Sequence, residues 1–299
     1  MKRIQADLAL LLAAFIWGSG FVAQRVAGMA GGLFYYNGLR FLLGSLVLLP
    51  LVGFHLKIDK KNMGGVLLAG SILAIATILQ QGGIRSTTAG NAALITGLYV
   101  ILVPLILSVF LHRKLHWSSW SAALLGAAGT VLLSANGPLR LAPGDLLELA
   151  GTVFWSLHVI VIGMMMERMP ALPFSIGQFA IAGLINLAGG LAFETYGPSG
   201  LLAAGFQVPW LQQAWWTILY TGILSIAIGY TLQAAGQRHA PPTEAAVIMS
   251  MEGVFAVLFG YLFLSELLSV VQLVGCVLIL LAILLAQLRP TTQAVPLPD

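Results

Sequence analysis

The sequence predicts an all-α integral membrane protein with ten transmembrane helices in two inverted five-helix repeats. Of its 299 residues, 59% are hydrophobic and only 8% are charged, whereas soluble domains carry about 25% charged residues. The chain therefore lacks the charge to cover a water-facing surface. Apolar runs of about 20 residues, the length that crosses a bilayer, occur ten times. Part of the chain also matches itself at a fixed offset, which indicates an internal repeat.

Glycine or charged residues bound the apolar runs of the first half. Gly31-Gly32 separates the first two runs, and Arg113-Lys114 follows the fourth. The first run follows a basic N-terminus, as in a signal peptide, but a signal peptide precedes a soluble domain. Nine further runs follow here, so we interpret it as a retained membrane helix. The runs cover Asp7–Ala27, Phe34–Phe54, Met63–Ile84, Thr88–Leu111 and Trp117–Asn136.

Proline marks the boundaries of the second half. Asn136-Gly137-Pro138 precedes the sixth run, Pro170 precedes the seventh, and Pro241-Pro242 begins the ninth. Of the 13 prolines, only Pro104 lies near the middle of a run, which supports these boundaries because proline interrupts helices. The five runs cover Gly144–Met166, Pro173–Glu194, Ala214–Gly236, Pro241–Leu264 and Ser269–Leu288.

The distribution of Lys and Arg predicts the orientation, because cytoplasmic loops are enriched in both. With the N-terminus inside, ten of these residues lie on the cytoplasmic side and three, Arg25, Arg85 and Arg140, lie outside. We therefore predict a multi-pass protein of the plasma (bacterial inner) membrane with both termini cytoplasmic. The tail, residues 290–299, is expected to be disordered.

Shifting the chain by 153 residues aligns Leu79–Leu111 with Leu232–Leu264. Ten of those 33 positions are identical, and they include the polar pairs Gln80/Gln233 and Arg85/Arg238. Five runs per copy mean that the second copy enters the membrane from the opposite side. Such inverted repeats are typical of secondary transporters, with the substrate site between the copies near the midplane. The predicted repeats are 1–136 and 137–289.

Short motifs along the chain resemble those of the drug/metabolite transporter superfamily, in its ten-helix EamA type. Trp17-Gly18-Ser19-Gly20 resembles the family's entry motif in helix one, and Arg40-Phe41-Leu42 resembles its arginine motif in helix two. Glu252-Gly253-Val254 and the segment 260–266 resemble its ninth-helix elements, although Gly253 replaces a common proline and Arg113 a common glutamate. The resemblance implies substrate transport, commonly efflux of amino acids or other small metabolites.

Aromatic and polar residues near span midpoints are candidates for the wall of a substrate cavity, because such groups are costly inside a bilayer unless they face a cavity or a partner. Trp17 and Trp155 lie about halfway along their helices, in Phe-Ile-Trp and Val-Phe-Trp segments at corresponding places of the two copies. Core packing is the alternative interpretation. We expect Trp17, Phe21, Tyr99, Trp155 and Glu252 to line one midplane cavity.

Glu252 is the deepest carboxylate, and the repeat pairs it with Tyr99. A buried carboxylate must be protonated or paired. Arg40 is the one basic residue left inside a run, which makes it the expected partner, in a structural or gating role. A static Glu252–Arg40 pair would be structural, whereas a pair broken by substrate or proton would be mechanistic. Both interpretations stay open.

Four further residues are weaker candidates. His158 is either a hydrogen-bonded core residue or a proton carrier that lines the cavity, and Gln80 and Gln233 could bind the polar end of a substrate or link helices. Pro104 frees the carbonyl near Val100, so helix four is a candidate hinge. Glu148, near the outer mouth of helix six, is expected to be a solvated carboxylate at a helix start.

No motif for a metalloprotease, a nucleotide-binding loop or a serine hydrolase is present in the sequence. We therefore expect no enzyme activity, cofactor, metal or nucleic-acid partner. The predicted function is secondary transport of a small amphipathic metabolite, an amino acid or similar, by alternating access, with export favoured by the resemblance and protons as a candidate coupling ion. Uptake of a vitamin or other metabolite is the close alternative, and a channel or scaffold the distant one. The sequence leaves the oligomeric state open.

Overall fold

The computed structural model describes residues 3–30, 32–53, 56–87, 89–133, 143–195, 209–264 and 269–287. These residues contain helices and no strand, and eight helical segments are long and apolar enough to cross a membrane. The shorter helices α6 and α13 occupy the fifth and tenth predicted runs. The prediction of an all-α membrane protein is confirmed. The predicted tail, 290–299, lies outside the described residues.

The helices of the first half follow the first five predicted runs. They are α1 (Arg3–Ala30), α2 (Phe34–Val52), α3 (Lys60–Ile84), α4 (Ala89–Gly97), α5 (Tyr99–Val109) and α6 (Trp117–Leu133). In the second half, the π-helical segment η2 ends the seventh run and the π-helical segment η3 interrupts the eighth. The elements are α7 (Pro143–Met166), α8 (Ala171–Gly189), η2 (Gly190–Thr195), α9 (Pro209–Tyr220), η3 (Thr221–Tyr230), α10 (Thr231–Gln237), α11 (Pro242–Met249), α12 (Met251–Leu264) and α13 (Val270–Gln287).

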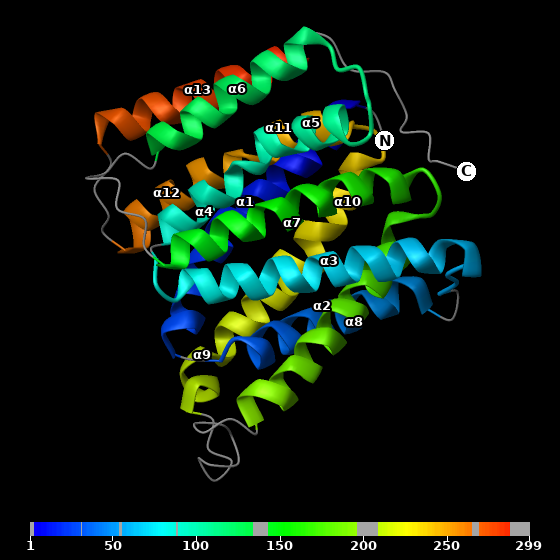
Figure 1. Ribbon diagram of the computed structural model, residues 1–299. Helices are drawn as coiled ribbons and strands as arrows, with labels where there is room; N and C mark the ends of the chain where they lie inside the picture. The colour runs from blue at the N-terminus through cyan, green and yellow to red at the C-terminus, as the bar shows by residue number, and fades with distance from the viewer. Residues whose placement is uncertain are drawn as a thin grey trace.

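The helices form one bundle with two flanking pairs (Figure 1). α6 packs along α13 on one flank and α2 along α8 on the other, while α1, α3, α7 and α12 lie between them. α1 begins and α13 ends toward the same end of the bundle. Arg3 of α1 forms an ion pair with Glu244 near the start of α11, so the first and ninth runs begin on the same side.

The fourth and ninth runs are both interrupted, within one residue of positions that the 153-residue offset relates. α4 ends at Gly97 and α5 begins at Tyr99, while α11 ends at Met249 and α12 begins at Met251. The first break lies just before Val100, where the proline argument expects a hinge, and the Leu98 N–H donates to the Ile95 carbonyl (3.1 Å) in a tight turn. The second break, at Ser250, has no proline near it. Breaks of this kind expose backbone groups where transporters bind substrate.

Glu194, near the end of η2, caps the N-terminus of α2. Its carboxylate accepts hydrogen bonds from the backbone N–H groups of Leu33 (2.5 Å), Phe34 (3.0 Å) and Tyr35 (2.9 Å). These groups have no partner within the helix, and the helix dipole favours an anion there. Next to it, the hydroxyl groups of Tyr35 and Thr195 are hydrogen-bonded. Glu194 thus links the two helices of one flank.

Replacing Glu194 by alanine should therefore destabilise the bundle by about 1–2 kcal/mol, the usual cost of losing a helix cap. The measurement is the unfolding midpoint of the purified protein in detergent. Glu194→Gln keeps one acceptor oxygen and should lose less than half as much. Equal midpoints for wild type and Glu194→Ala would show that the cap contributes nothing.

Candidate functional site

A buried cavity of about 40 Å³ lies between the two halves of the chain. This volume is large enough to hold water. Every lining side chain except Trp17 is buried. The lining residues are Trp17, Phe21, Gln24, Arg40, Gln80, Thr96, Tyr99, Trp155, Val159, Ser225, Ile226, Tyr230, Gln233, Met249 and Glu252.

The cavity wall combines helices from both halves. α1, α2, α3, α4 and α5 contribute from the first half, and α7, η3, α10, α11 and α12 from the second. The flanking pair α6 and α13 contributes no lining residue. Both breaks lie beside the cavity, since the lining residues Tyr99 and Glu252 are each within two residues of a break.

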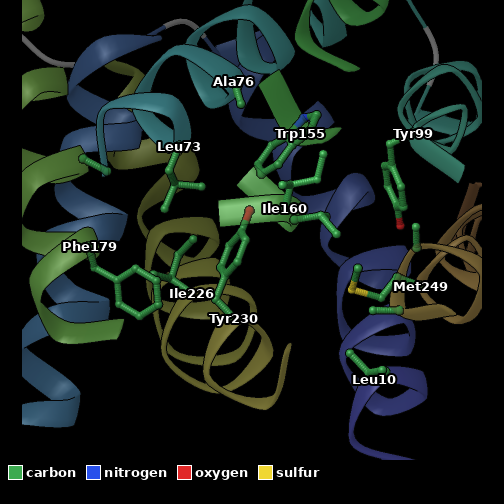
Figure 2. Close-up of a cluster of buried hydrophobic side chains, with 14 of the residues drawn as sticks. Leu10, Leu73, Ala76, Tyr99, Trp155, Ile160, Phe179, Ile226, Tyr230 and Met249 are labelled. Atoms are coloured by element: carbon green, nitrogen blue, oxygen red, sulfur yellow. The ribbon is translucent and has the colours of Figure 1, made fainter. Parts of the chain in front are cut away.

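Tyr230 forms the centre of an aromatic wall. Its ring lies 4.8 Å from that of Trp17 and 6.2 Å from that of Trp155, centroid to centroid, and is stacked nearly parallel to Trp155. Figure 2 shows Tyr230 directed toward Trp155, with Phe179 and Ile226 beside it. Aromatic faces like these bind apolar groups and also attract cations.

Trp17 is held in place by the π-helical segment η3. Its indole Nε1 donates a hydrogen bond to the Ser225 carbonyl (3.1 Å). In a π-helix the i→i+5 pattern shifts backbone pairing, and such segments frequently occur at functional sites. Because Ser225, Ile226 and Tyr230 all lie in η3 and line the cavity, this local irregularity shapes a large part of the wall.

The cavity contains one buried acid and one buried base that are not paired with each other. Within the described residues, no ion pair joins Glu252 to Arg40. The Arg40 guanidinium instead lies over the rings of Tyr36 (5.0 Å) and Phe41 (5.4 Å), and its Nε has no hydrogen-bond partner. The expected ion pair between Arg40 and Glu252 is therefore not formed in this conformation, in which the guanidinium contacts the aromatic rings instead.

Glu252 has Tyr99 as its polar neighbour. The two groups interact electrostatically, but neither Oε1 of Glu252 nor the Tyr99 hydroxyl has a partner with hydrogen-bond geometry. The Trp155 indole N–H, the Ser225 hydroxyl and Oε1 of Gln233 are also without partners. Buried polar atoms are nearly always hydrogen-bonded in proteins, so this concentration at one cavity indicates that a bound molecule or water completes it.

Seven of the eight residues predicted to line the cavity do lie on its wall. They are Trp17, Phe21, Gln80, Tyr99, Trp155, Gln233 and Glu252. Arg40, predicted in a structural or gating role, joins them there. Pro104 is buried within α5 and is not among the lining residues.

His158 lies behind the cavity wall, contrary to its prediction as a lining residue. Its Nε2 is hydrogen-bonded to Oε1 of Gln178 on α8 (2.8 Å), and its ring packs edge-on against Tyr230. At 3.6 residues per turn, Trp155 and Val159 share a face of α7, and His158 is rotated from that face toward α8. The alternative of a hydrogen-bonded core histidine fits this position.

Glu148 is fully buried, which corrects the expectation of a solvated carboxylate. α3 approaches α7 closely at this point, where Gly83 and Gly144 leave room for backbone contact. The helix start therefore packs against α3, and the carboxyl group accepts a hydrogen bond from the Thr96 hydroxyl (3.4 Å). Helical position alone could not reveal this contact with another helix.

Among the residues that sequence reasoning missed, Tyr230 is the most important. An aromatic residue in an apolar run carries no distinguishing signal, and the residue paired with it by the repeat is Thr77, so symmetry gives no hint either. Gln24 and Ser225 also line the cavity and were missed. Among the described residues, no group of three or more His, Cys, Asp or Glu residues could hold a metal ion.

Comparison with known proteins agrees with this architecture. The chain is 32% identical over 295 residues to an uncharacterized transporter of Archaeoglobus fulgidus, covering 97% of this chain and 88% of that protein. It is 25% identical to the uncharacterized transporter YwfM of Bacillus subtilis, covering 98% and 97%. A crystal structure with 19% identity superposes with a TM-score of 0.76, covering 96% of this chain and 98% of the other, and supports the fold. The model of the EamA-like transporter family matches residues 4–135 and 142–288, and the chain belongs to this family.

Proposed function

We propose that this protein carries a small amphipathic metabolite, an amino acid or a similar zwitterion with an apolar side chain, across the bacterial inner membrane. The cavity carries the proposal, because it holds one unpaired acid, one unpaired base and a wall of aromatic rings. A buried unpaired charge is costly. A zwitterion offsets both costs at once, with its ammonium group toward Glu252 and its carboxylate toward Arg40.

The aromatic wall fits the apolar part of such a substrate. Trp17, Tyr230 and Trp155 present ring faces, and few fixed charges surround them. Sugar phosphates and nucleotides suit this wall poorly, since phosphate recognition commonly uses several arginine or lysine groups. Arg40 is the one Lys or Arg side chain among the lining residues.

Alternating access of two inverted repeats, 1–136 and 137–289, is the proposed mechanism. The breaks at Leu98 and Ser250 lie within one residue of repeat-related positions beside the cavity, and they provide two similar points at which helices can bend. The buried lining residues support a carrier rather than an open channel, and the cavity itself supports a carrier rather than a solid scaffold. The proposed direction, export, follows the resemblance alone, and the proposed cytoplasmic position of both termini follows the distribution of Lys and Arg.

Flux measurements in proteoliposomes test the substrate class. Labelled apolar amino acids should show saturable flux. The corresponding amine, which lacks the carboxylate, and the corresponding carboxylic acid, which lacks the ammonium group, should each compete at least tenfold more weakly than the amino acid. A tenfold change corresponds to about 1.4 kcal/mol, less than one charged hydrogen bond contributes. If the three compounds compete equally, or if flux does not saturate, the zwitterion assignment is wrong.

Tyr230 provides a second test of the aromatic wall. Tyr230→Leu removes the ring face that Tyr230 offers to the substrate. An aromatic contact contributes up to about 1.5 kcal/mol, so the KM for an apolar amino acid should rise about tenfold. Tyr230→Phe is the matched variant and should keep KM within about threefold of wild type. Equal KM values for Tyr230→Leu and Tyr230→Phe would show that the aromatic ring of Tyr230 does not contribute to substrate binding.

A further inference from the structure

We propose that Glu148 is a proton-binding site outside the substrate cavity, and that its protonation reverses a hydrogen-bond chain through Thr96 that ends at Gln80 on the cavity wall. The site would couple proton binding to the hydrogen-bonding group, donor or acceptor, that Gln80 presents to the substrate. For the identity of that substrate the inference rests on the proposed function, whereas the proton site itself can be tested with no substrate present.

Glu148 lies in the second turn of α7, and its side chain is 0% exposed. Oε2 accepts the hydrogen bond from Thr96, while Oε1 is buried without a partner. A buried carboxylate without a cation is neutralised most simply by a proton. Within the described residues, no Lys or Arg forms an ion pair with Glu148.

The surroundings of Glu148 leave a proton as the available counter-charge. α3 contributes Gly83 and Gln80, and α4 contributes Thr96. On α7 itself the nearest charged group is Asp145, which repels a second negative charge and accepts a hydrogen bond from Thr87 (2.5 Å).

The other charged or titratable groups nearby are engaged elsewhere. Arg25 of α1 donates to the Ile84 carbonyl (2.5 Å), and the side chain of Arg85, after α3, is exposed. Tyr99 of α5 interacts with Glu252, and Glu244 of α11 pairs with Arg3 at the opposite end of the bundle (Figure 1).

A short chain of hydrogen bonds connects this carboxyl group to the cavity. Nε2 of Gln80 donates to the Thr96 hydroxyl (3.2 Å), which in turn donates to Oε2 of Glu148 (3.4 Å). Gln80 and Thr96 line the cavity, whereas Glu148 does not. Thr96 therefore stands between a titratable group and an amide that faces the substrate site.

The direction of this chain depends on the proton. An ionised carboxylate only accepts, so Thr96 must donate to it and Gln80 must donate to Thr96, which leaves Oε1 of Gln80 as an acceptor for the cavity. When Glu148 takes up a proton from water, its O–H donates to Thr96, and Thr96 donates to Oε1 of Gln80 after the amide turns over. Gln80 then presents its NH₂ group to the cavity, so one proton changes an acceptor into a donor.

Infrared difference spectra of the lipid-reconstituted protein, between acidic and alkaline buffer and with no substrate, test the proton site. Wild type should show a carboxylic acid C=O band and a glutamine side-chain amide band that change together. Glu148→Gln should remove this carboxylic acid band, while the matched variant Asp145→Asn should keep it. Thr96→Val should keep the carboxylic acid band but abolish the change in the amide band. The amide band that disappears in Gln80→Met is the band of Gln80. A band that survives in Glu148→Gln, or an amide change that survives in Thr96→Val, would overturn the proposal.

Transport then tests the coupling. In proteoliposomes with labelled apolar amino acids, a pH gradient should drive accumulation by wild type. The quantity compared is the ratio of this accumulation to counterflow at symmetric pH. It should fall at least tenfold in Glu148→Gln and in Thr96→Val. In Thr96→Ser, which keeps the hydroxyl group, the ratio should stay within about twofold of wild type. An unchanged ratio in Glu148→Gln would overturn the coupling role. Absence of counterflow in wild type would instead contradict the proposed function, and the infrared result would still decide the proton site.

Discussion

Replacing Glu252 by glutamine should lower kcat/KM for a zwitterionic amino acid about 10- to 100-fold while the protein stays folded. The loss follows from the contact between the carboxylate and the substrate ammonium group, because a hydrogen bond to a charged group contributes about 1.5–3 kcal/mol. Folding should survive because a neutral amide of the same shape is less costly to bury than an unpaired carboxylate. The measurement is initial flux in proteoliposomes, with the unfolding midpoint as a check on folding.

The matched control for Glu252→Gln is Asp59→Asn, which removes one negative charge from an exposed site far from the cavity wall. Asp59 is about two-thirds exposed, and its contact with Lys61 is long (3.8 Å), so flux should stay within about twofold of wild type, since exposed ion pairs contribute 0–1 kcal/mol. If Glu252→Gln leaves both folding and transport unchanged, Glu252 has no part in the mechanism.

The spans could be predicted from the sequence because the thickness of the bilayer sets a length that apolar runs must meet. The internal breaks could not be predicted with the same precision. Pro104 pointed to the break before Tyr99, but the break at Ser250 has no proline near it. The π-helical segment η3 likewise left no mark in the composition of the eighth run.

The cavity residues could be predicted where the repeat or a charge singled them out. Trp17 and Trp155 recur at corresponding places, and Glu252 is a carboxylate near the middle of a predicted span. His158 was misplaced because neighbouring helical residues differ in direction by 100°, so one residue decides between cavity and core. Glu148 and its contact with Thr96 depend on the close approach of three helices, which sequence spacing within one helix does not contain.

The position of Glu252 depends on one glycine on the facing helix. At Gly18, α1 crosses α12 so closely that a Cβ atom would lie 2.5 Å from Cβ of Phe255 and 2.9 Å from both the Ala256 nitrogen and the Glu252 carbonyl oxygen. Two of these neighbours are backbone atoms, which cannot turn aside as the end of a flexible side chain does. Any side chain at this position must therefore push α12, and Glu252 with it, away from α1.

Gly18→Ala should accordingly destabilise the protein by about 1–3 kcal/mol, the usual cost of overpacking, and should lower transport through the displaced Glu252. Gly64→Ala is the matched control, because a Cβ atom at this helical glycine of α3 meets nothing within 4 Å. Alanine favours a helix over glycine by about 1 kcal/mol in both variants, so the difference between their unfolding midpoints isolates the contact between α1 and α12. Equal midpoints and equal flux for the two variants would mean that α1 and α12 do not cross at Gly18 as closely as the structure has them.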